Sequence, residues 1–304
     1  MDKKKVVQKA LNAGFLISPN TLEKLDDNNI EAAIQGTKSV VIEEIKTDVK
    51  TTELDVSFKK TRTKKKLTIH DFVKYYNNVY DNLKNILLKK IEATSINKVA
   101  NITSEVSVIG MVKEITSQGF VLEDPTGQIV VISNEIPEHN NVVAVTGVVR
   151  EKKLFKKSIN YPDVPLPKVI PKIDVKLLTT TSKDIPEGYD LIISTEKDNK
   201  DKNIYKMNSN PSWIKIKKGE TKITMLIYRT NVTIDENSFN SYIKTRILPS
   251  KNNTPNEDVL IDAIPDIIWI IQDQEWTRNY KGITVFSSNT TTSIDLNSRE
   301  VKFV

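Results

Sequence analysis

The chain has 304 residues and no cysteine, and its 45 Lys and Arg against 39 Asp and Glu give a formal net charge of +6 at pH 7. Disulfide bonds, thiolate catalysis and zinc–thiolate sites are therefore excluded, and two histidines, His70 and His139, cannot supply the imidazoles of a two-metal hydrolase. Because no apolar run approaches the ~20 residues of a membrane span and the N-terminus lacks an apolar signal core, we expect a soluble cytoplasmic protein without a cofactor.

Residues 1–35 are predicted to form a small helical domain. Apolar residues recur on one helical face at Val6, Val7, Ala10 and Leu11. Gln8 and Leu11 followed by Phe15 also fit part of a sliding-clamp-binding box, but Gly14 stands where one of the paired aromatic residues belongs. We favour an ordinary amphipathic helix, so direct binding to a sliding clamp is not expected.

Residues 36–67 are predicted to be a charged linker, because they are rich in Lys, Thr, Glu and Asp and carry one short apolar patch at 40–42. Lys64, Lys65 and Lys66 form a basic cluster that could neutralise phosphates of a nucleic acid. A solvated linker is the alternative interpretation, and it is the more common one.

Residues 68–168 are predicted to be a helix followed by a small β domain. Thr68 with Asp71 three residues later is typical of a helix start. The apolar stripe of this helix comprises Phe72, Tyr76, Val79, Leu83, Ile86, Leu87 and Ile91. Five short strands then follow within 105–160, with Gly110 in the first and a turn at 124–127, a pattern that indicates an OB-type barrel.

The predicted barrel offers lysines for nucleic acid but few aromatic rings. Barrels that bind single strands stack bases on exposed aromatic residues above a basic groove. Here the rings are Phe120 and, further on, Phe155. The candidate phosphate-binding residues are Lys152, Lys153, Lys156 and Lys157. We therefore expect phosphate contacts without strong base stacking.

Residues 184–304 are predicted to be a second domain built on buried strands. The most informative stretch begins at Pro265-Asp266, continues through an apolar run, and ends with Gln272 and Gln274. A second apolar run follows Tyr280-Lys281-Gly282, so the segment indicates strand, loop, strand. Polar side chains at a strand end are where many folds hold their chemistry, but glutamine has no useful pKa and binds transition metals poorly. Asp266 is expected to order the strand end.

Several motifs, in the same order, resemble the small subunit of archaeal family D DNA polymerase, a family related to the calcineurin-like phosphoesterases. They are 13–19, 71–80, 108–112 with 123–127, 161–165, 244–249, and 265–267 with 280–282. The resemblance extends from Ala13 to Phe303. It implies an α+β multidomain fold with an N-terminal helical unit, an OB-fold barrel, and a truncated phosphoesterase α/β sandwich that lacks its metal site.

The same resemblance implies that the metal ligands are lost. The family has Ser-Asp-x-His after one strand and histidines in three later motifs. At those ligand positions this chain has Thr195, Lys197, Arg229, Ile247, Gln272 and Gln274. Two further family motifs, Gly-Asp-x-x-Asp and Gly-Asn-His-Asp, are not found. We therefore expect no catalytic and no metal-binding residues.

The expected function is that of a non-catalytic small subunit that scaffolds the large catalytic subunit of a family D-type DNA polymerase, with DNA as a further partner and no membrane contact. Candidate anchors for the large subunit are Trp213, Trp269 and Trp276, because aromatic residues often dominate interfaces. Burial within its own domain is the alternative for Trp269. Two other functions remain open: a free-standing single-strand-binding OB protein and, disfavoured, an active metal-dependent 3′–5′ exonuclease.

Overall fold

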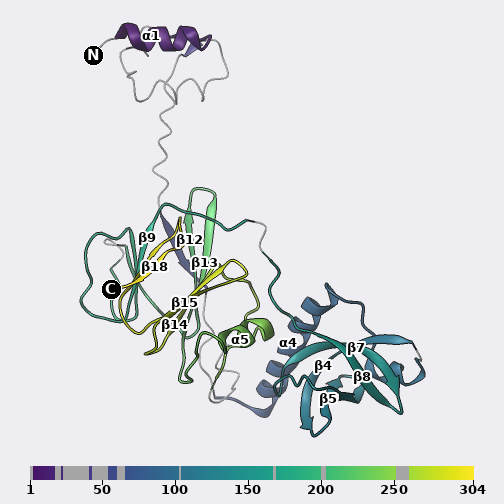
Figure 1. Cartoon of the computed structure of the whole chain (residues 1–304). Helices are drawn as coiled ribbons and strands as arrows, with labels where there is room; N and C mark the ends of the chain where they lie inside the picture. Colours follow the sequence, from purple (N-terminus) through teal and green to yellow (C-terminus); the bar gives the residue numbers. More distant parts are fainter. Residues whose placement is uncertain are drawn as a thin grey trace. The chain divides into compact units, whose positions relative to one another are not determined.

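A computed structural model describes most of the chain, which divides into two compact units, Met1–Leu54 and Asp55–Val304 (Figure 1). The described residues are 3–17, 22, 41–42, 54–59, 66–102, 104–166, 169–199, 203–250 and 260–304. The architecture is mixed α+β, with most of the regular structure in strands, as expected from the sequence. Among the described residues, no helix is long and apolar enough to cross a membrane.

The first unit contains the predicted N-terminal helix, α1 (Lys3–Asn12), which buries Val6 and Ala10. Strand β1 (Leu16–Ile17) follows and pairs in parallel with β2 (Val41–Ile42). Because β2 lies inside the predicted 36–67 linker, that prediction is wrong at this point. The rest of the predicted helical domain, and most of the linker with Lys64 and Lys65, lie outside the described residues.

Helix α4 (Ile69–Leu88) begins as predicted, with a capping box in which the Thr68 and Asp71 side chains each bind the other's backbone N–H. Its buried residues Val79, Tyr80, Leu83 and Leu87 pack against Ile109, Val142 and Ala144. The helix is therefore fastened along one stripe to the β domain that follows it. A short 3₁₀ helix, η1 (Ile96–Asn101), connects the two.

Five strands after α4 form a closed barrel. They are β4 (Glu105–Thr116), β5 (Gly119–Asp124), β6 (Gly127–Ile132), β7 (Val142–Arg150) and β8 (Lys153–Asn160). The order around the barrel is β4-β5-β6-β8-β7, with β6 and β8 parallel and every other pair antiparallel. The predicted glycine in the first strand is required by close packing, since a Cβ at Gly110 would lie 2.8 Å from the Glu123 carbonyl oxygen.

The remaining strands form two sheets. The first, in spatial order, has β15 (Trp276–Tyr280), β16 (Ile283–Ser287), β14 (Ile267–Ile271), β13 (Thr221–Arg229), β12 (Ser212–Lys218) and β3 (Asp55–Phe58). The second has β11 (Ile204–Lys206), β10 (Leu191–Ser194), β9 (Lys176–Thr180), β17 (Thr292–Asp295) and β18 (Val301–Phe303). All five residues of β14 are buried, as its apolar sequence predicts for a strand covered on both faces.

One face of the six-stranded sheet is covered by helix α5 (Phe239–Thr245) and the chain around it. Phe239 and Ile243 of this helix pack on Ile268 and Ile270 of β14 in one buried cluster. The sheet corrects two predictions. Strand β3 comes from the predicted linker, and β15 occupies part of the predicted loop between the two apolar runs.

Asp266 orders the start of β14, as predicted. Its Oδ2 accepts a hydrogen bond from the Thr224 N–H at 2.7 Å, and its own N–H donates to the Thr224 carbonyl oxygen at 2.8 Å. Burial raises the pKa of this carboxyl group, while the hydrogen bond from Thr224 acts in the opposite direction. The residue therefore links β14 to β13 at the end of the sheet that lies away from the polar strand ends.

The connector that leaves the barrel is held by a polar group of residues, which we call the clamp: Lys90, Asp163, Arg246, Tyr280 and Lys281. The Asp163 carboxylate accepts a hydrogen bond from the Tyr280 hydroxyl at 2.9 Å and forms an ion pair with Lys281. Arg246 Nε donates to the Pro162 carbonyl oxygen at 2.9 Å, and Lys90 Nζ donates to the Asp163 carbonyl oxygen at 2.6 Å. The clamp thus joins α4, the connector, the end of α5 and the β15–β16 turn.

Candidate functional site

A polar cleft of ≈ 730 Å³ lies where strands of both sheets end. Strands β9 and β10 are parallel to each other, and so are β13, β14 and β16. The residues at or just beyond their carboxyl ends line the cleft: Thr181, Thr195, Arg229, Gln272 and Asn289. Ligands of α/β sheets commonly bind outside the carboxyl ends of parallel strands, which makes this cleft the candidate site.

The structure brings together in this cleft four of the six positions at which the resemblance implies lost metal ligands. They are Thr195, Arg229, Gln272 and Gln274. Lys197 is exposed and does not line the cleft, and its N–H donates to the Ser194 Oγ at 3.1 Å. Ile247 is also elsewhere, since it forms an isolated bridge with Leu260 and packs against the core.

Gln272 is engaged in holding the cleft rim. Its Oε1 accepts from the Ile234 N–H at 2.9 Å, and its Nε2 donates to the Ile234 carbonyl oxygen at 2.6 Å. The Trp276 indole N–H donates to the same carbonyl oxygen at 3.0 Å. Both backbone polar groups of the fully buried Ile234 are thereby satisfied.

The side-chain amide of Asn210 makes an equivalent pair of hydrogen bonds to the backbone of Arg229, the last residue of β13. Asn210 Oδ1 accepts from the Arg229 N–H at 2.8 Å, and Asn210 Nδ2 donates to the Arg229 carbonyl oxygen at 2.7 Å. Each amide side chain therefore pairs with the backbone of one rim residue. Neither contact could be predicted from the sequence, because each joins residues that are distant in the chain.

The remaining polar groups of the cleft do not form a metal-binding set. Its carboxylates are Glu196 and Asp273, and Asp273 Oδ1 accepts from Asn289 Nδ2 at 3.0 Å. No histidine lines the cleft, and the cation Arg229 does. Across the described part of the chain, no three His, Cys, Asp or Glu side chains are grouped so as to hold a metal ion. These donors do not fit the two-metal centre of a phosphoesterase, which needs several imidazoles and carboxylates.

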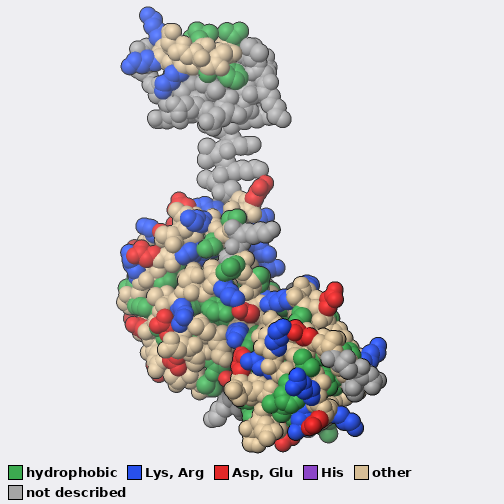
Figure 2. All heavy atoms as spheres, turned by 45° about the vertical axis from the view of Figure 1, so that its right-hand side comes forward, with side chains coloured by type: hydrophobic (Ala, Val, Ile, Leu, Met, Phe, Trp, Pro, Cys, Tyr) green, Lys and Arg blue, Asp and Glu red, His purple; other side chains and the backbone are tan. Residues whose placement is uncertain are grey.

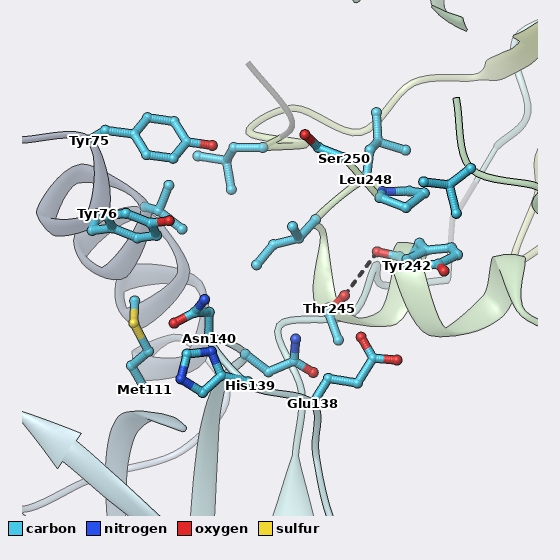
Figure 3. Close-up of a pocket in the computed structure, with 16 residues that line it drawn as sticks. Tyr75, Tyr76, Met111, Glu138, His139, Asn140, Tyr242, Thr245, Leu248 and Ser250 are labelled. Atoms are coloured by element: carbon cyan, nitrogen blue, oxygen red, sulfur yellow. Dashed lines mark hydrogen bonds between the residues drawn. The ribbon is translucent and has the colours of Figure 1, made fainter. Parts of the chain in front are cut away.

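A second cavity, of ≈ 260 Å³, lies between α4, the loop before β7 and the chain after α5 (Figure 3). Tyr75 and Tyr76 of α4 approach it from one side, and Tyr242 and Leu248 approach it from the other. Ile247 lines this cavity rather than the polar cleft. His139, one of the two histidines, is also here, with Glu138 beside it, and it does not line the polar cleft that contains Thr195, Arg229, Gln272 and Gln274.

The predicted nucleic-acid residues of the barrel are partly neutralised. Lys156 pairs with Glu135 at 3.0 Å, and Lys157 pairs with Glu105 at 2.6 Å. Lys152 lies in the turn between β7 and β8, and Lys153 begins β8. Phe120 is fully buried in the barrel core, so it cannot stack on a base, whereas Phe155 is 42% exposed.

The three tryptophans differ in how far their side chains are exposed to solvent. Trp269 is fully buried, stacks on Phe286 and donates its indole N–H to the Ser288 carbonyl oxygen at 3.1 Å. It is therefore corrected from a candidate interface residue to a core residue. Trp213 and Trp276 are half-buried against the core under α5. Lys59 lies over the Trp213 ring at 5.6 Å from its centre.

Comparison with known proteins supports the resemblance drawn from the motifs. Over 109 residues the chain is 30% identical to the DNA polymerase II small subunit of Archaeoglobus fulgidus. The match covers 32% of this chain and 22% of that relative, so it spans less than a quarter of the relative's length. No family model matches the chain. The similarity links part of the chain to a polymerase small subunit.

Proposed function

We propose that this protein is a non-catalytic accessory subunit of a family D-type DNA polymerase, which binds and scaffolds the large catalytic subunit. In this proposal the barrel is an OB fold, and the two sheets are a shortened phosphoesterase sandwich. The barrel order and its parallel β6–β8 pair support the first assignment. The cleft at the parallel strand ends supports the second.

The observation that carries the proposal is the state of Gln272. Gln272 lies at the end of a buried strand, at a position where the resemblance expects a metal ligand. Both polar atoms of its side-chain amide form hydrogen bonds with the backbone of Ile234. This side chain has no ionisable group to exchange a proton with a substrate. The same cleft has Thr195 and Arg229 at two other ligand positions, and a cation there would repel a metal ion.

A second support is the clamp, four of whose five residues belong to motifs that resemble the family. Asp163 lies in the 161–165 motif, Arg246 in the 244–249 motif, and Tyr280 with Lys281 in the 280–282 motif. In this chain these residues contact the connector between barrel and sheets. The shared motifs are thus accounted for by domain architecture, which a scaffold needs even without catalysis. The single-strand-binding alternative is not favoured, because Phe120 is buried.

The catalytic half of the proposal is tested with purified protein, Mn²⁺, and DNA that carries a 3′ mismatch. We expect no hydrolysis above a heat-treated control. The double variant Q272H/Q274H is expected to stay inactive as well, because Thr195 and Arg229 remain. Turnover in either protein that is abolished by a chelator would contradict the proposal.

The scaffold half is tested by co-expression of the full chain with the family D large subunit from the same host. We expect the two to co-elute in a fixed ratio on size-exclusion chromatography. Charge reversal at Lys64, Lys65 and Lys66 serves as a control and is expected to leave the complex intact. Separate elution of the two wild-type chains would remove this half of the proposal.

A further inference from the structure

The β12–β13 hairpin carries a concentration of lysines that the sequence analysis did not single out. Between residues 215 and 222 it has four lysines, Lys215, Lys217, Lys218 and Lys222, and one acid, Glu220. The pairing of β13 with β14 begins only at Met225, so the hairpin tip extends beyond the neighbouring strand. Figure 1 shows the hairpin projecting at one end of the sheet, and Figure 2 shows several Lys and Arg side chains at that end.

Three of these lysines share one face of the sheet. Lys217 lies directly opposite Lys222 in the antiparallel pair, and Lys215 is two residues before Lys217 on the same strand. Alternate residues of a strand point to the same face, and the buried ones here are Ile214 and Ile216. The three ammonium groups therefore face solvent together. Lys218 points to the other face and donates to the Asp174 carbonyl oxygen at 2.7 Å.

In the part of the chain that the structure describes, lysines outnumber the carboxylates on this face of the hairpin. Among the described residues, the side chains of Lys215, Lys217 and Lys222 have no hydrogen bond and no carboxylate within 4.0 Å. Asp55 lies directly opposite Lys217 on β3, and Lys222 acts electrostatically on the Asp266 carboxyl group, which accepts from the Thr224 N–H. Like charges directly opposite each other on paired strands destabilise a sheet. Three lysines on one face, with one carboxylate directly opposite Lys217, leave an excess of positive charge that an anionic ligand would neutralise.

The lysines of the barrel differ from those of the hairpin in having carboxylate partners. Two of the barrel's four candidate lysines, Lys156 and Lys157, already have carboxylate partners, Glu135 and Glu105. Lysines two residues apart on a strand are about 7 Å from each other, and directly opposed ones about 5 Å. A row with that spacing suits a polymer with closely repeated negative charges better than a single small anion.

We propose that the solvent face of the β12–β13 hairpin, through Lys215, Lys217 and Lys222, binds the phosphate backbone of DNA. The choice of DNA among polyanions rests on the proposed polymerase function, whereas the phosphate contact rests on the hairpin alone. Among the described residues of this face, no exposed aromatic ring accompanies the three lysines, because Trp213 is half-buried beneath Lys59. Binding is therefore independent of base sequence.

The test measures binding of the full chain to a fluorescent DNA duplex by anisotropy at several salt concentrations. The hairpin variant K215Q/K217Q/K222Q is compared with a barrel variant, K153Q/K156Q/K157Q, that removes the same number of lysines. We expect the hairpin variant to lose about tenfold or more in affinity at 0.1 M salt, and its slope of log affinity against log salt to fall by about 2–3. The barrel variant should lose less.

Thermal unfolding is measured on the same proteins. The hairpin variant should be about as stable as the wild type, because it removes both the repulsion between Lys217 and Lys222 and the attraction of Lys217 to Asp55, so weaker binding cannot be ascribed to unfolding. Unchanged DNA affinity in the hairpin variant, or an equal loss in the barrel variant, overturns the proposal. Binding of poly-glutamate as tightly as DNA also overturns it and indicates an acidic protein partner.

These outcomes are distinct from those of the proposed function. A hairpin variant that binds DNA normally but still co-elutes with the large subunit removes only the hairpin site. A wild-type chain that binds DNA through the hairpin but does not co-elute with the large subunit keeps the hairpin site and removes the scaffold role.

Discussion

The clamp and the polar cleft both contain residues from motifs that resemble one family, and they differ in the kinds of side chain that they hold. The clamp keeps charged and hydroxyl groups, with Asp163 bound to Tyr280 and Lys281. The cleft has neutral amides and hydroxyls, together with Arg229, at the positions where metal ligands are expected. The charged groups of the clamp thus connect parts of the fold, whereas Thr195, Arg229, Gln272 and Gln274 of the cleft offer neither an imidazole nor a carboxylate.

The largest expected effect comes from breaking the clamp. Asp163→Ala removes the carboxylate that Lys281 and Tyr280 share, and it leaves a half-buried ammonium group unpaired. We expect a loss of about 2–3 kcal/mol in the free energy of unfolding, measured by urea denaturation. Asp174→Ala is the control and should cost less than about 0.5 kcal/mol, because the Asp174 carboxylate makes no hydrogen bond or ion pair with any described residue. Equal stability of the two variants would remove the clamp as a structural element.

A smaller effect is expected from the cleft. Gln272→Ala leaves the Ile234 N–H without a partner, while its carbonyl oxygen keeps the Trp276 indole. An unsatisfied buried N–H costs about 1–3 kcal/mol, so we expect about 2 kcal/mol by the same denaturation measurement. The matched control is Gln274→Ala, because that side chain is exposed, and it should change stability by less than about 0.5 kcal/mol. If both glutamines prove equally dispensable, Gln272 does not hold the rim.

The smallest effect concerns one hydrogen bond of the clamp. Tyr280→Phe removes the hydroxyl that donates to Asp163, and we expect a loss of about 1 kcal/mol at pH 7. Burial, followed by the hydrogen bond to Asp163, raises the pKa of Tyr280 above its ordinary value of 10.0. The difference in stability between wild type and variant should therefore be complete below pH 10 and shrink as the pH rises above it, since the unfolded tyrosine ionises first. A difference that grows above pH 10 would contradict this account.

Local signals predicted much of this fold. The capping box of Thr68 and Asp71, and the apolar stripe behind it, were sufficient to predict α4. The uniformly apolar run before Gln272 was sufficient to predict a strand buried on both faces. In contrast, β15 was missed because its residues are mostly polar, as suits an edge strand that is paired on one side only.

The features that were not predicted depend on contacts between distant residues. Lys156 and Lys157 formed part of a basic run in the sequence, and only the barrel brings Glu135 and Glu105 to them. The amide contacts of Gln272 need the chain at Ile234, which the cleft geometry places beside it. Four altered ligand positions do meet in one cleft, but Ile247 does not, because its strand-like bridge to Leu260 directs it elsewhere.

Strand β3 is synthesised long before β12, the strand with which it pairs. Val56 pairs with Ile216, so the ribosome completes the helix α4 and the whole barrel before the partner of β3 is synthesised. At about 5–20 residues per second, β3 waits on the order of ten seconds without its neighbour. A fragment that starts after the barrel would emerge with the edge of β12 uncovered, and exposed strand edges promote aggregation. Nascent-chain stability should therefore rise in two steps, first with the barrel and later with the six-stranded sheet.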